Sequence, residues 1–342
     1  MQKVNLKDLS LQEIEGLVFS LGEKSYRGRQ IYEWVFQKDV SGIGEMTNLS
    51  IGLRNKLSEL AYILRLSIAD KRTSSDGTSK YLFILEDGNS IESVLIPDED
   101  RLTLCISTQV GCKLNCTFCL TGKGGFIRNL SHYEIIEQIL SVKREGHNIT
   151  NVVLMGMGEP LDNYDNVIKS IKTMTSPHGL KIPAKRITLS TSGLIPEIKK
   201  LAKENLKINL AISLNASNNE TRDKIMPVNK KYPIEELFKA LKEYPLPPNR
   251  RITFEYVMIK GLNDSIEDAI RLSNLLKNIK CKINLIPFNS FEGSDYQAPD
   301  SMSVEEFQNL LISRHYTVII RKSKGADICA ACGQLRSTRL EG

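Results

Sequence analysis

The chain has 342 residues, of which 41% are hydrophobic and 25% are charged, a balance typical of a folded globular protein rather than a disordered one. No apolar run approaches the roughly 18 residues that a membrane-spanning helix needs. The first ten residues, MQKVNLKDLS, lack the apolar stretch of an export signal, so we expect a cytoplasmic protein. The net charge of +6 permits a nucleic-acid partner, although an ordinary solvated surface can carry the same charge.

The first 65 residues show apolar positions at helical spacing. Helices are expected over Leu11–Leu21, with Ser10 as N-cap, and over Tyr26–Gln37 and Ile51–Leu60. A β-hairpin follows, with strands Tyr81–Ile84 and Ile91–Ile96 around an Asp-Gly turn. We therefore predict that residues 1–90 form a small helical accessory domain that ends in a hairpin.

From residue 102 onward, short apolar runs alternate with helical segments, which predicts βα units and a parallel sheet. Ser131 and Glu134 form a capping box at the start of one helix. The pattern alone does not separate an open barrel from a doubly wound sheet, but both bind ligands at the carboxyl ends of the strands. The expected strands are Leu102–Thr108, Val152–Met155, Ile187–Ser190, Ile208–Leu214, Ile252–Met258 and Lys282–Ile286, and a last one at Val318–Ile320.

Seven cysteines are present, and five of them fall in two short stretches. An odd number without an export signal does not indicate a disulfide framework. Cys112, Cys116 and Cys119 form C-x3-C-x2-C in a loop after the first strand of the alternating part. Three thiolates are one short of a closed zinc site but suit a cubane iron–sulfur cluster with one open iron. An open iron can chelate S-adenosylmethionine, and this spacing resembles the signature of the radical S-adenosylmethionine superfamily. The alternative is zinc with a distant fourth ligand.

Polar residues stand at the ends of several expected strands, where a ligand would lie. Gly158 and Glu159 follow the second strand, and the Glu159 carboxylate could hold the ammonium group of a methionyl ligand. Further polar side chains end the third, fourth and sixth strands: Ser190, Ser213 with Asn215, and Asn289.

The second cysteine pair, Cys329 and Cys332, lies in a tail rich in small residues, GADICAACGQL. The pair could be half of a zinc knuckle, a redox pair, one nucleophile beside an incidental thiol, or two unreactive thiols. Cys105 lies inside the first strand of the alternating part, where a buried cysteine is usually part of the core. The segment 181–207 holds seven basic residues against two glutamates, which indicates either an RNA contact or a solvated helix face.

These motifs together resemble the RlmN/Cfr family of radical S-adenosylmethionine RNA methyltransferases, and within it the RlmN branch, which methylates C2 of adenosine in 23S rRNA and in certain tRNAs. The resemblance runs from about residue 90 to 335, and the N-terminal helices resemble the accessory domain of the family less specifically. It rests on the segments TLCISTQVGCKLNCTFC, GFIRNL, MGMGEPLDNYDNV, LSTSG, MPVNKKYPI, FEYVMIKGLND, CKINLIPFN and DICAACGQL.

The resemblance implies a partial (βα)6 barrel over residues 91–320, an RNA-contacting accessory domain over 1–90 and a tail over 321–342. It implies one [4Fe-4S] cluster and two molecules of S-adenosylmethionine per turnover. The partners would be 23S rRNA, tRNA and a one-electron donor such as flavodoxin or ferredoxin, and the enzyme would act as a monomer. By the same resemblance, the cluster ligands are Cys112, Cys116 and Cys119, and the residues that contact S-adenosylmethionine are Gly158, Glu159, Ser190, Ser213, Leu214, Asn215 and Asn289.

The resemblance also implies a mechanism. The Cys332 thiolate takes a methyl group from S-adenosylmethionine, and a radical made from a second molecule removes hydrogen from that methyl group. The resulting carbon radical adds to the electron-poor C2, Glu92 accepts the C2 proton, and Cys105 attacks Cys332 to release the RNA and leave a disulfide.

This chain departs from the family pattern at two positions. Asn215 stands where the family often has histidine, and Cys329 stands where it often has aspartate. Two other functions remain open at this stage, namely C8 methylation of the Cfr type and a non-catalytic metal-binding RNA protein.

Overall fold

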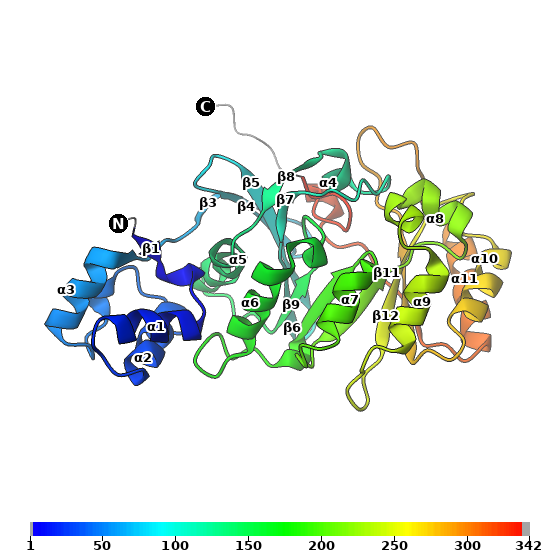
Figure 1. Cartoon of the computed structure of the whole chain (residues 1–342). Coiled ribbons are helices and arrows are strands. Elements are labelled where there is room, and N and C mark those ends of the chain that lie inside the picture. The colour runs from blue at the N-terminus through cyan, green and yellow to red at the C-terminus, as the bar shows by residue number, and fades with distance from the viewer. Residues whose placement is uncertain (1–2, 337–342) are drawn as a thin grey trace.

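The structure is a computed structural model that describes residues 3–336, and its elements are arranged along one elongated molecule (Figure 1). Helices are α1 (Leu11–Ser20), α2 (Tyr26–Phe36), α3 (Ile51–Leu60), α4 (Leu120–Lys123), α5 (His132–Arg144), α6 (Tyr164–Thr175), α7 (Ile195–Leu201), α8 (Asn219–Ile225), α9 (Ile234–Lys242), α10 (Ile266–Leu275) and α11 (Ser301–Ser313). Strands are β1 (Val4–Asn5), β2 (Ala61–Tyr62), β3 (Ser67–Thr73), β4 (Ser79–Ile84), β5 (Ser90–Asp98), β6 (Arg101–Cys105), β7 (Gln109–Gly111), β8 (Phe126–Asn129), β9 (Asn151–Leu154), β10 (Ile187–Thr191), β11 (Asn209–Ser213), β12 (Ile252–Met258), β13 (Cys281–Pro287) and β14 (Val318–Ile320).

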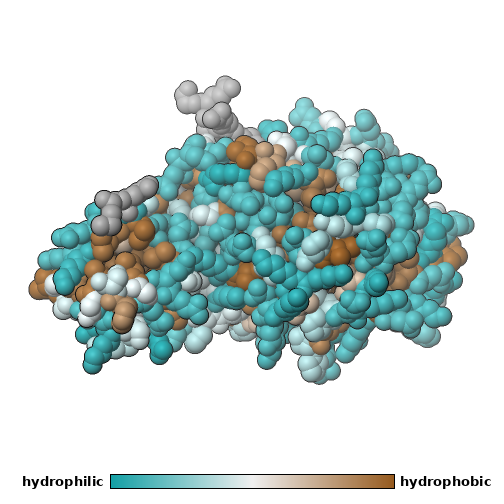
Figure 2. All heavy atoms as spheres, in the orientation of Figure 1, coloured by the Kyte–Doolittle hydropathy of each residue, from teal (hydrophilic) through white to brown (hydrophobic). Residues whose placement is uncertain are grey.

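The N-terminal helices α1 to α3 form one end of the molecule (Figure 1). The Ser10 hydroxyl accepts from Glu13 N while the Glu13 carboxylate accepts from Ser10 N, so α1 begins with a complete capping box. Figure 2 shows a largely hydrophilic surface with apolar areas over these helices, and their exposed apolar side chains include Phe19 and Ile51.

The central sheet confirms the predicted βα alternation. Its described strands run in the order β14-β13-β12-β11-β10-β9-β6-β5-β4-β3, and the pairings from β6 to β14 are parallel. Because β14 and β3 stand at opposite ends of this order, the sheet is open, which confirms a partial barrel. Helices α5, α6, α7 and α9 cover one face (Figure 1), and the predicted capping box at Ser131 begins α5.

The predicted hairpin forms β4 and β5, and these strands extend the main sheet by antiparallel pairing with β6. A further antiparallel strand, β3, precedes them. Its sequence SIADKRT is mostly polar and exposed, so it lacks the apolar alternation from which a strand is usually predicted. The division of the chain at residue 90 therefore falls within one continuous sheet and stays a prediction.

Within residues 3–336, no helix is long and apolar enough to cross a membrane.

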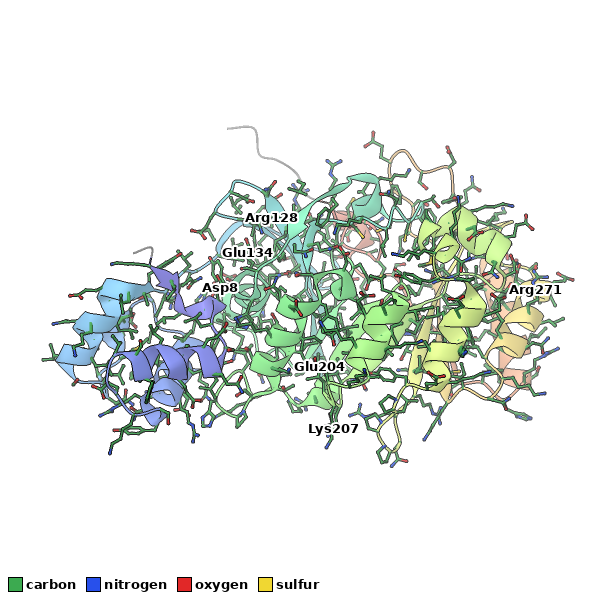
Figure 3. All side chains as sticks on the ribbon, in the orientation of Figure 1. Asp8, Arg128, Glu134, Glu204, Lys207 and Arg271 are labelled. Atoms are coloured by element: carbon green, nitrogen blue, oxygen red, sulfur yellow. The ribbon has the colours of Figure 1, made fainter. Side chains whose placement is uncertain are left out.

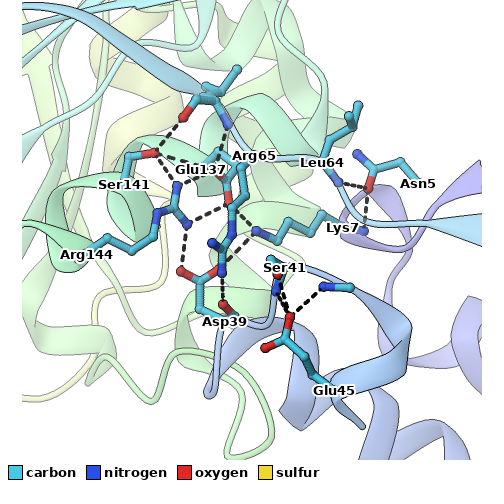
Figure 4. Close-up of polar contacts among 12 residues, drawn as sticks. Asn5, Lys7, Asp39, Ser41, Glu45, Leu64, Arg65, Glu137, Ser141 and Arg144 are labelled. Carbon is cyan, nitrogen blue, oxygen red and sulfur yellow. Dashed lines mark hydrogen bonds and ion pairs between the residues drawn. The ribbon is translucent and has the colours of Figure 1, made fainter.

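A buried ionic network joins the N-terminal helices to the barrel helix α5 (Figure 4). Lys7 Nζ lies 3.0 Å from Asp39 Oδ1 and also contacts Glu137, and the side chains of Lys7 and Glu137 are fully buried. Arg144 completes the network, with nitrogens 2.6 Å from Asp39 and 2.8 Å from Glu137. Buried charges are tolerated only when each has a partner, so the network fixes how the N-terminal helices pack on α5.

Replacing Lys7 by methionine should destabilise the protein by about 3 kcal/mol, because it leaves two buried carboxylates with one cation fewer. Urea denaturation followed by circular dichroism measures this change. Lys224→Met is the matched control, since its ion pair with Glu220 is exposed and such pairs contribute little. Equal unfolding midpoints for the two variants would contradict the proposed strength of the network.

Candidate active site

A cavity opens at the carboxyl ends of the parallel strands. The residues that line it come from successive strand ends, from the loop before α4 and from the C-terminal tail. They include Cys112, Cys116, Cys119, Gly158, Glu159, Ser190, Ser213, Asn215, Glu255, Asn289, Arg321 and Cys332. The structure thus brings together most of the residues that the sequence motifs indicated.

The three cysteines of the C-x3-C-x2-C motif lie in the loop between β7 and β8 and line one side of the cavity. Burial raises the pKa of the Cys112 thiol to about 12 and that of Cys116 well above its ordinary value. Neighbouring thiols contribute to the rise of both pKa values. Such thiols become thiolates only beside a cation or metal. The donor set therefore fits a bound metal centre.

The arrangement favours a cluster over a single ion. Among the described residues, no group of three or more His, Cys, Asp or Glu side chains is placed to hold one metal ion. A tetrahedral zinc site needs all its sulfurs about 2.3 Å from the same atom. A cubane cluster instead binds each cysteine to a different iron, so its sulfurs stand apart around a cavity. The zinc alternative lacks the convergence of ligands that it requires.

Glu159 is the buried carboxylate of the strand-end motif. One oxygen accepts from Ser192 N at 2.8 Å and the other from Leu161 N at 3.1 Å. Burial raises its pKa to about 7, so a cationic ligand would stabilise its charged form. Gly158 precedes it at φ +97°, and a Cβ there would lie 2.5 Å from Gln109, so only glycine fits.

The other predicted cofactor contacts differ in what their side chains do. Ser190 and Ser213 face each other with 3.4 Å between their hydroxyl oxygens. The Asn215 side chain is engaged with Val257 N and the Met226 sulfur, and its φ of 57° is one that asparagine tolerates. Leu214 is buried but is not among the residues lining the cavity.

Asn289 holds the C-terminal tail. Its Nδ2 donates to the Cys332 carbonyl at 3.1 Å, and its Oδ1 accepts from Ser323 Oγ. Leu120 N donates to the Gly333 carbonyl at 2.7 Å, which ties the tail to the loop after Cys119. These backbone contacts leave Cys332 exposed within the cavity.

Cys105 is buried at the end of β6 and is not among the residues that line the cavity. Burial is the main cause of the rise in the pKa of its thiol to about 12, and Cys332 contributes to that rise. All seven cysteines are free in the structure.

Glu92 lines a second cavity together with Lys80, Cys329 and Arg336. Cys332 lines the first cavity but not the second. The proton acceptor and the methyl carrier that the resemblance implies therefore line different cavities, and tail residues line both.

Sequence reasoning missed three charged residues around the first cavity. Glu255 is buried in β12, and its Oε1 accepts from Asn284 at 2.9 Å while its Oε2 has no hydrogen-bond partner among the described residues. Arg321 follows β14 and lines the cavity beside Cys332. A lone charge inside an apolar strand is a signal that would have pointed to Glu255.

Arg222, the third of these residues, is fully buried on α8. Its guanidinium donates to the carbonyls of Leu214, Ser192 and Ser213 and to Asn229 Oδ1. It therefore fixes the loops that follow β10 and β11 beside the cavity.

Basic residues of the segment 181–207 lie away from the cavity, although Ser190 in the same segment lines it. Lys181, Lys185 and Arg186 precede β10, and Lys203 and Lys207 precede β11, so these residues border the amino ends of parallel strands, opposite the cavity. Figure 3 shows Lys207 at the lower edge of the molecule, away from the C-terminal tail. Lys200 is also paired with Asp165 at 3.1 Å. This location favours a solvated face over contact with a base bound in the cavity.

Comparisons with known proteins agree with this site. Residues 106–273 match the Radical SAM superfamily, and residues 4–63 match the ribosomal RNA large subunit methyltransferase N-terminal domain. A dual-specificity RNA methyltransferase RlmN from Geotalea uraniireducens is 50% identical over 98% of this chain and 97% of its own length. The protein of the same name from Syntrophus aciditrophicus is 48% identical over 100% and 99%.

A crystal structure of a radical SAM methyltransferase from Sphaerobacter thermophilus superposes with a TM-score of 0.90 at 39% identity, covering 97% of this chain and 99% of that one. Radical SAM enzymes bind a [4Fe-4S] cluster and S-adenosylmethionine, and the thiols and carboxylates of the cavity fit both. These findings confirm the resemblance seen in the sequence motifs. The chain belongs to the RlmN family of radical SAM RNA methyltransferases.

Proposed function

We propose that this protein methylates C2 of adenosine in 23S rRNA and in tRNA, with Cys332 as the methyl carrier. The observation that carries the proposal is the exposure of Cys332 within the cavity that Cys112, Cys116 and Cys119 also line. A methyl carrier must reach both the methyl donor and the radical source, and this cavity is the place where both would bind. The dual-specificity name of the relatives supports the two RNA substrates.

In this proposal Cys112, Cys116 and Cys119 hold the cluster, and Glu159 holds the ammonium group of S-adenosylmethionine. Ser190 and Ser213 stand on neighbouring strands at the same edge and suit the polar part of the ligand. Leu214, Asn215 and Asn289 would also contact S-adenosylmethionine, and two of them, Asn215 and Asn289, line the cavity. Gly158 gives the ligand access to the backbone.

The first reaction in the proposal is a polar displacement. The Cys332 thiolate forms a bond to the methyl carbon as the bond to the sulfonium breaks, which neutralises both charges. When bound, the cluster and a second S-adenosylmethionine supply a radical that removes one hydrogen atom from the new methyl group. The resulting carbon radical, which is still bonded to the Cys332 sulfur, then adds to C2 of adenosine. C2 is electron-poor, so it cannot itself attack the sulfonium methyl group.

Release of the RNA needs a base and a second thiol. Glu92 takes the C2 proton, and Cys105 attacks the Cys332 sulfur, which forms a disulfide as the bond from sulfur to the methylene carbon breaks. The methylene carbon left on the base takes up one proton and becomes the methyl group, and a bound cluster would accept the one electron that remains. The position of Cys105 at the carboxyl end of β6, the edge of the sheet at which Cys332 lines the cavity, supports this step.

We further propose a monomer that acts in the cytoplasm, where its RNA substrates are found, and that flavodoxin or ferredoxin donates the electron. The N-terminal residues 1–90 would contact RNA, residues 91–320 would form the catalytic barrel, and residues 321–342 the methyl-carrying tail.

Anaerobic incubation of the cluster-loaded enzyme with S-adenosylmethionine should add one methyl group to Cys332, as seen by peptide mass spectrometry. The Cys332→Ala variant should show no methylated tail peptide. After RNA is added, nucleoside analysis should find 2-methyladenosine. An unmodified Cys332 in enzyme that is fully loaded with the cluster would contradict the carrier mechanism. Detection of 8-methyladenosine instead would show that the methylated position is C8 and not C2.

Replacing Cys105 by alanine should trap RNA covalently on Cys332, because no thiol remains to take the Cys332 sulfur. Denaturing gel electrophoresis of the enzyme with labelled RNA detects the adduct. Cys281→Ala is the control, since Cys281 is also buried but stands at the start of β13, at the amino ends of the parallel strands, and is not among the residues that line the cavity. Free methylated RNA from Cys105→Ala at the wild-type rate would show that Cys105 takes no part.

A further inference from the structure

Lys80 on β4 contacts both the proposed base and the methyl-carrying tail. Lys80 pairs across the sheet with Val94, and Leu82 pairs with Glu92, so Lys80 and Glu92 are diagonal neighbours on one face of the hairpin. Both side chains are nearly buried, with 12% and 10% of their surface exposed. They face the second cavity.

The contacts are specific. Lys80 Nζ lies 3.0 Å from Glu92 Oε1 and donates to the carbonyl of Cys329 at 3.2 Å. The other Glu92 oxygen accepts from the backbone of Arg336 at 3.1 Å. The Lys80 ammonium group thus links the Glu92 carboxylate to the tail backbone, three residues before Cys332. The hydrogen bond from Arg336 N also fixes the orientation of this carboxylate.

Lys80 is the cation that is paired with Glu92. Of the other charged residues lining the second cavity, Arg72 pairs with Asp70 at 2.9 Å, Arg336 reaches Glu92 through its backbone, and Glu292 is acidic. Among the described residues, Lys80 forms the one ion pair of Glu92. A carboxylate this buried, left without a cation, is expected to bind a proton.

We propose that Lys80 is the positioning residue of the proton-transfer step, holding Glu92 ionised and fixing it relative to the tail that carries Cys332. In that step the C2–H bond breaks, the proton bonds to a Glu92 oxygen, and the electron pair stays on the RNA adduct. Only an ionised Glu92 can accept the proton. The inference rests on the proposed function, because it names the residue that positions the base of that reaction.

The test separates the two halves of the reaction. In the Lys80→Met variant, transfer of a methyl group from S-adenosylmethionine to Cys332 should proceed at the wild-type rate, because that step needs no base at C2. Formation of 2-methyladenosine at pH 7 should fall about a hundredfold, the usual contribution of a general base. Activity of Lys80→Met should recover as the pH is raised, because Glu92 then ionises, whereas Glu92→Gln should stay slow at every pH. Lys80→Arg should restore most of the rate.

A second readout does not depend on turnover. Infrared spectroscopy of Lys80→Met at pH 7 should show a protonated carboxyl band that disappears in the double variant Lys80→Met/Glu92→Gln. Lys71→Met is the matched control, because Lys71 stands on the neighbouring strand and pairs with Glu145 outside the cavity. The Lys71→Met variant should show neither the protonated carboxyl band nor a pH-dependent loss of 2-methyladenosine formation.

The outcomes are distinguishable. If Lys80→Met keeps full activity, loses it equally at every pH, or shows no protonated carboxyl, Lys80 does not hold Glu92 ionised. If wild-type enzyme forms no methylated Cys332 and no 2-methyladenosine, the proposed function fails, and the infrared comparison still decides whether Lys80 sets the charge of Glu92.

Discussion

Parallel pairing of the strands is the constraint on which the site depends. Because β6 and β9 to β14 run in the same direction, their carboxyl ends meet at one edge of the sheet. Side chains that are far apart along the chain, such as Glu159, Ser213 and Asn289, therefore line a single cavity. Arg222 stabilises this edge, since its guanidinium binds carbonyls that follow two neighbouring strands.

The cavity becomes a reaction site only when segments outside the parallel sheet are added. The loop between β7 and β8 brings three thiols, and the tail brings a fourth. The tail is held mainly by backbone hydrogen bonds to Asn289 and Leu120 and by the contact of Lys80 with the Cys329 carbonyl. Backbone attachment leaves the Cys332 side chain free, which a thiol that changes its bonding partner requires.

The buried polar groups of the molecule fall into two classes. Lys7 and Glu137 are paired with opposite charges, and the Arg222 guanidinium is hydrogen-bonded to carbonyl and amide oxygens, so these residues fix how elements pack. Glu255 keeps an oxygen without a partner, and Cys112 and Cys116 are buried thiols. An unmatched buried group lowers stability, and in this cavity such groups are ready for a cationic ligand and a metal cluster.

The sequence by itself determined the βα alternation, the N-caps of α1 and α5, and the family, because apolar periodicity, capping boxes and cysteine spacing are local patterns. It did not predict β3, whose polar sequence lacks alternation, or the pairing of Lys80 with Glu92, which depends on strand register. Only the tertiary structure decided that Cys332 lines the same cavity as Cys112, Cys116 and Cys119, that Glu92 faces a second cavity, and that basic residues of the segment 181–207 stand at the far edge. These relations join residues that are distant along the chain, and the direction and order of the strands set them.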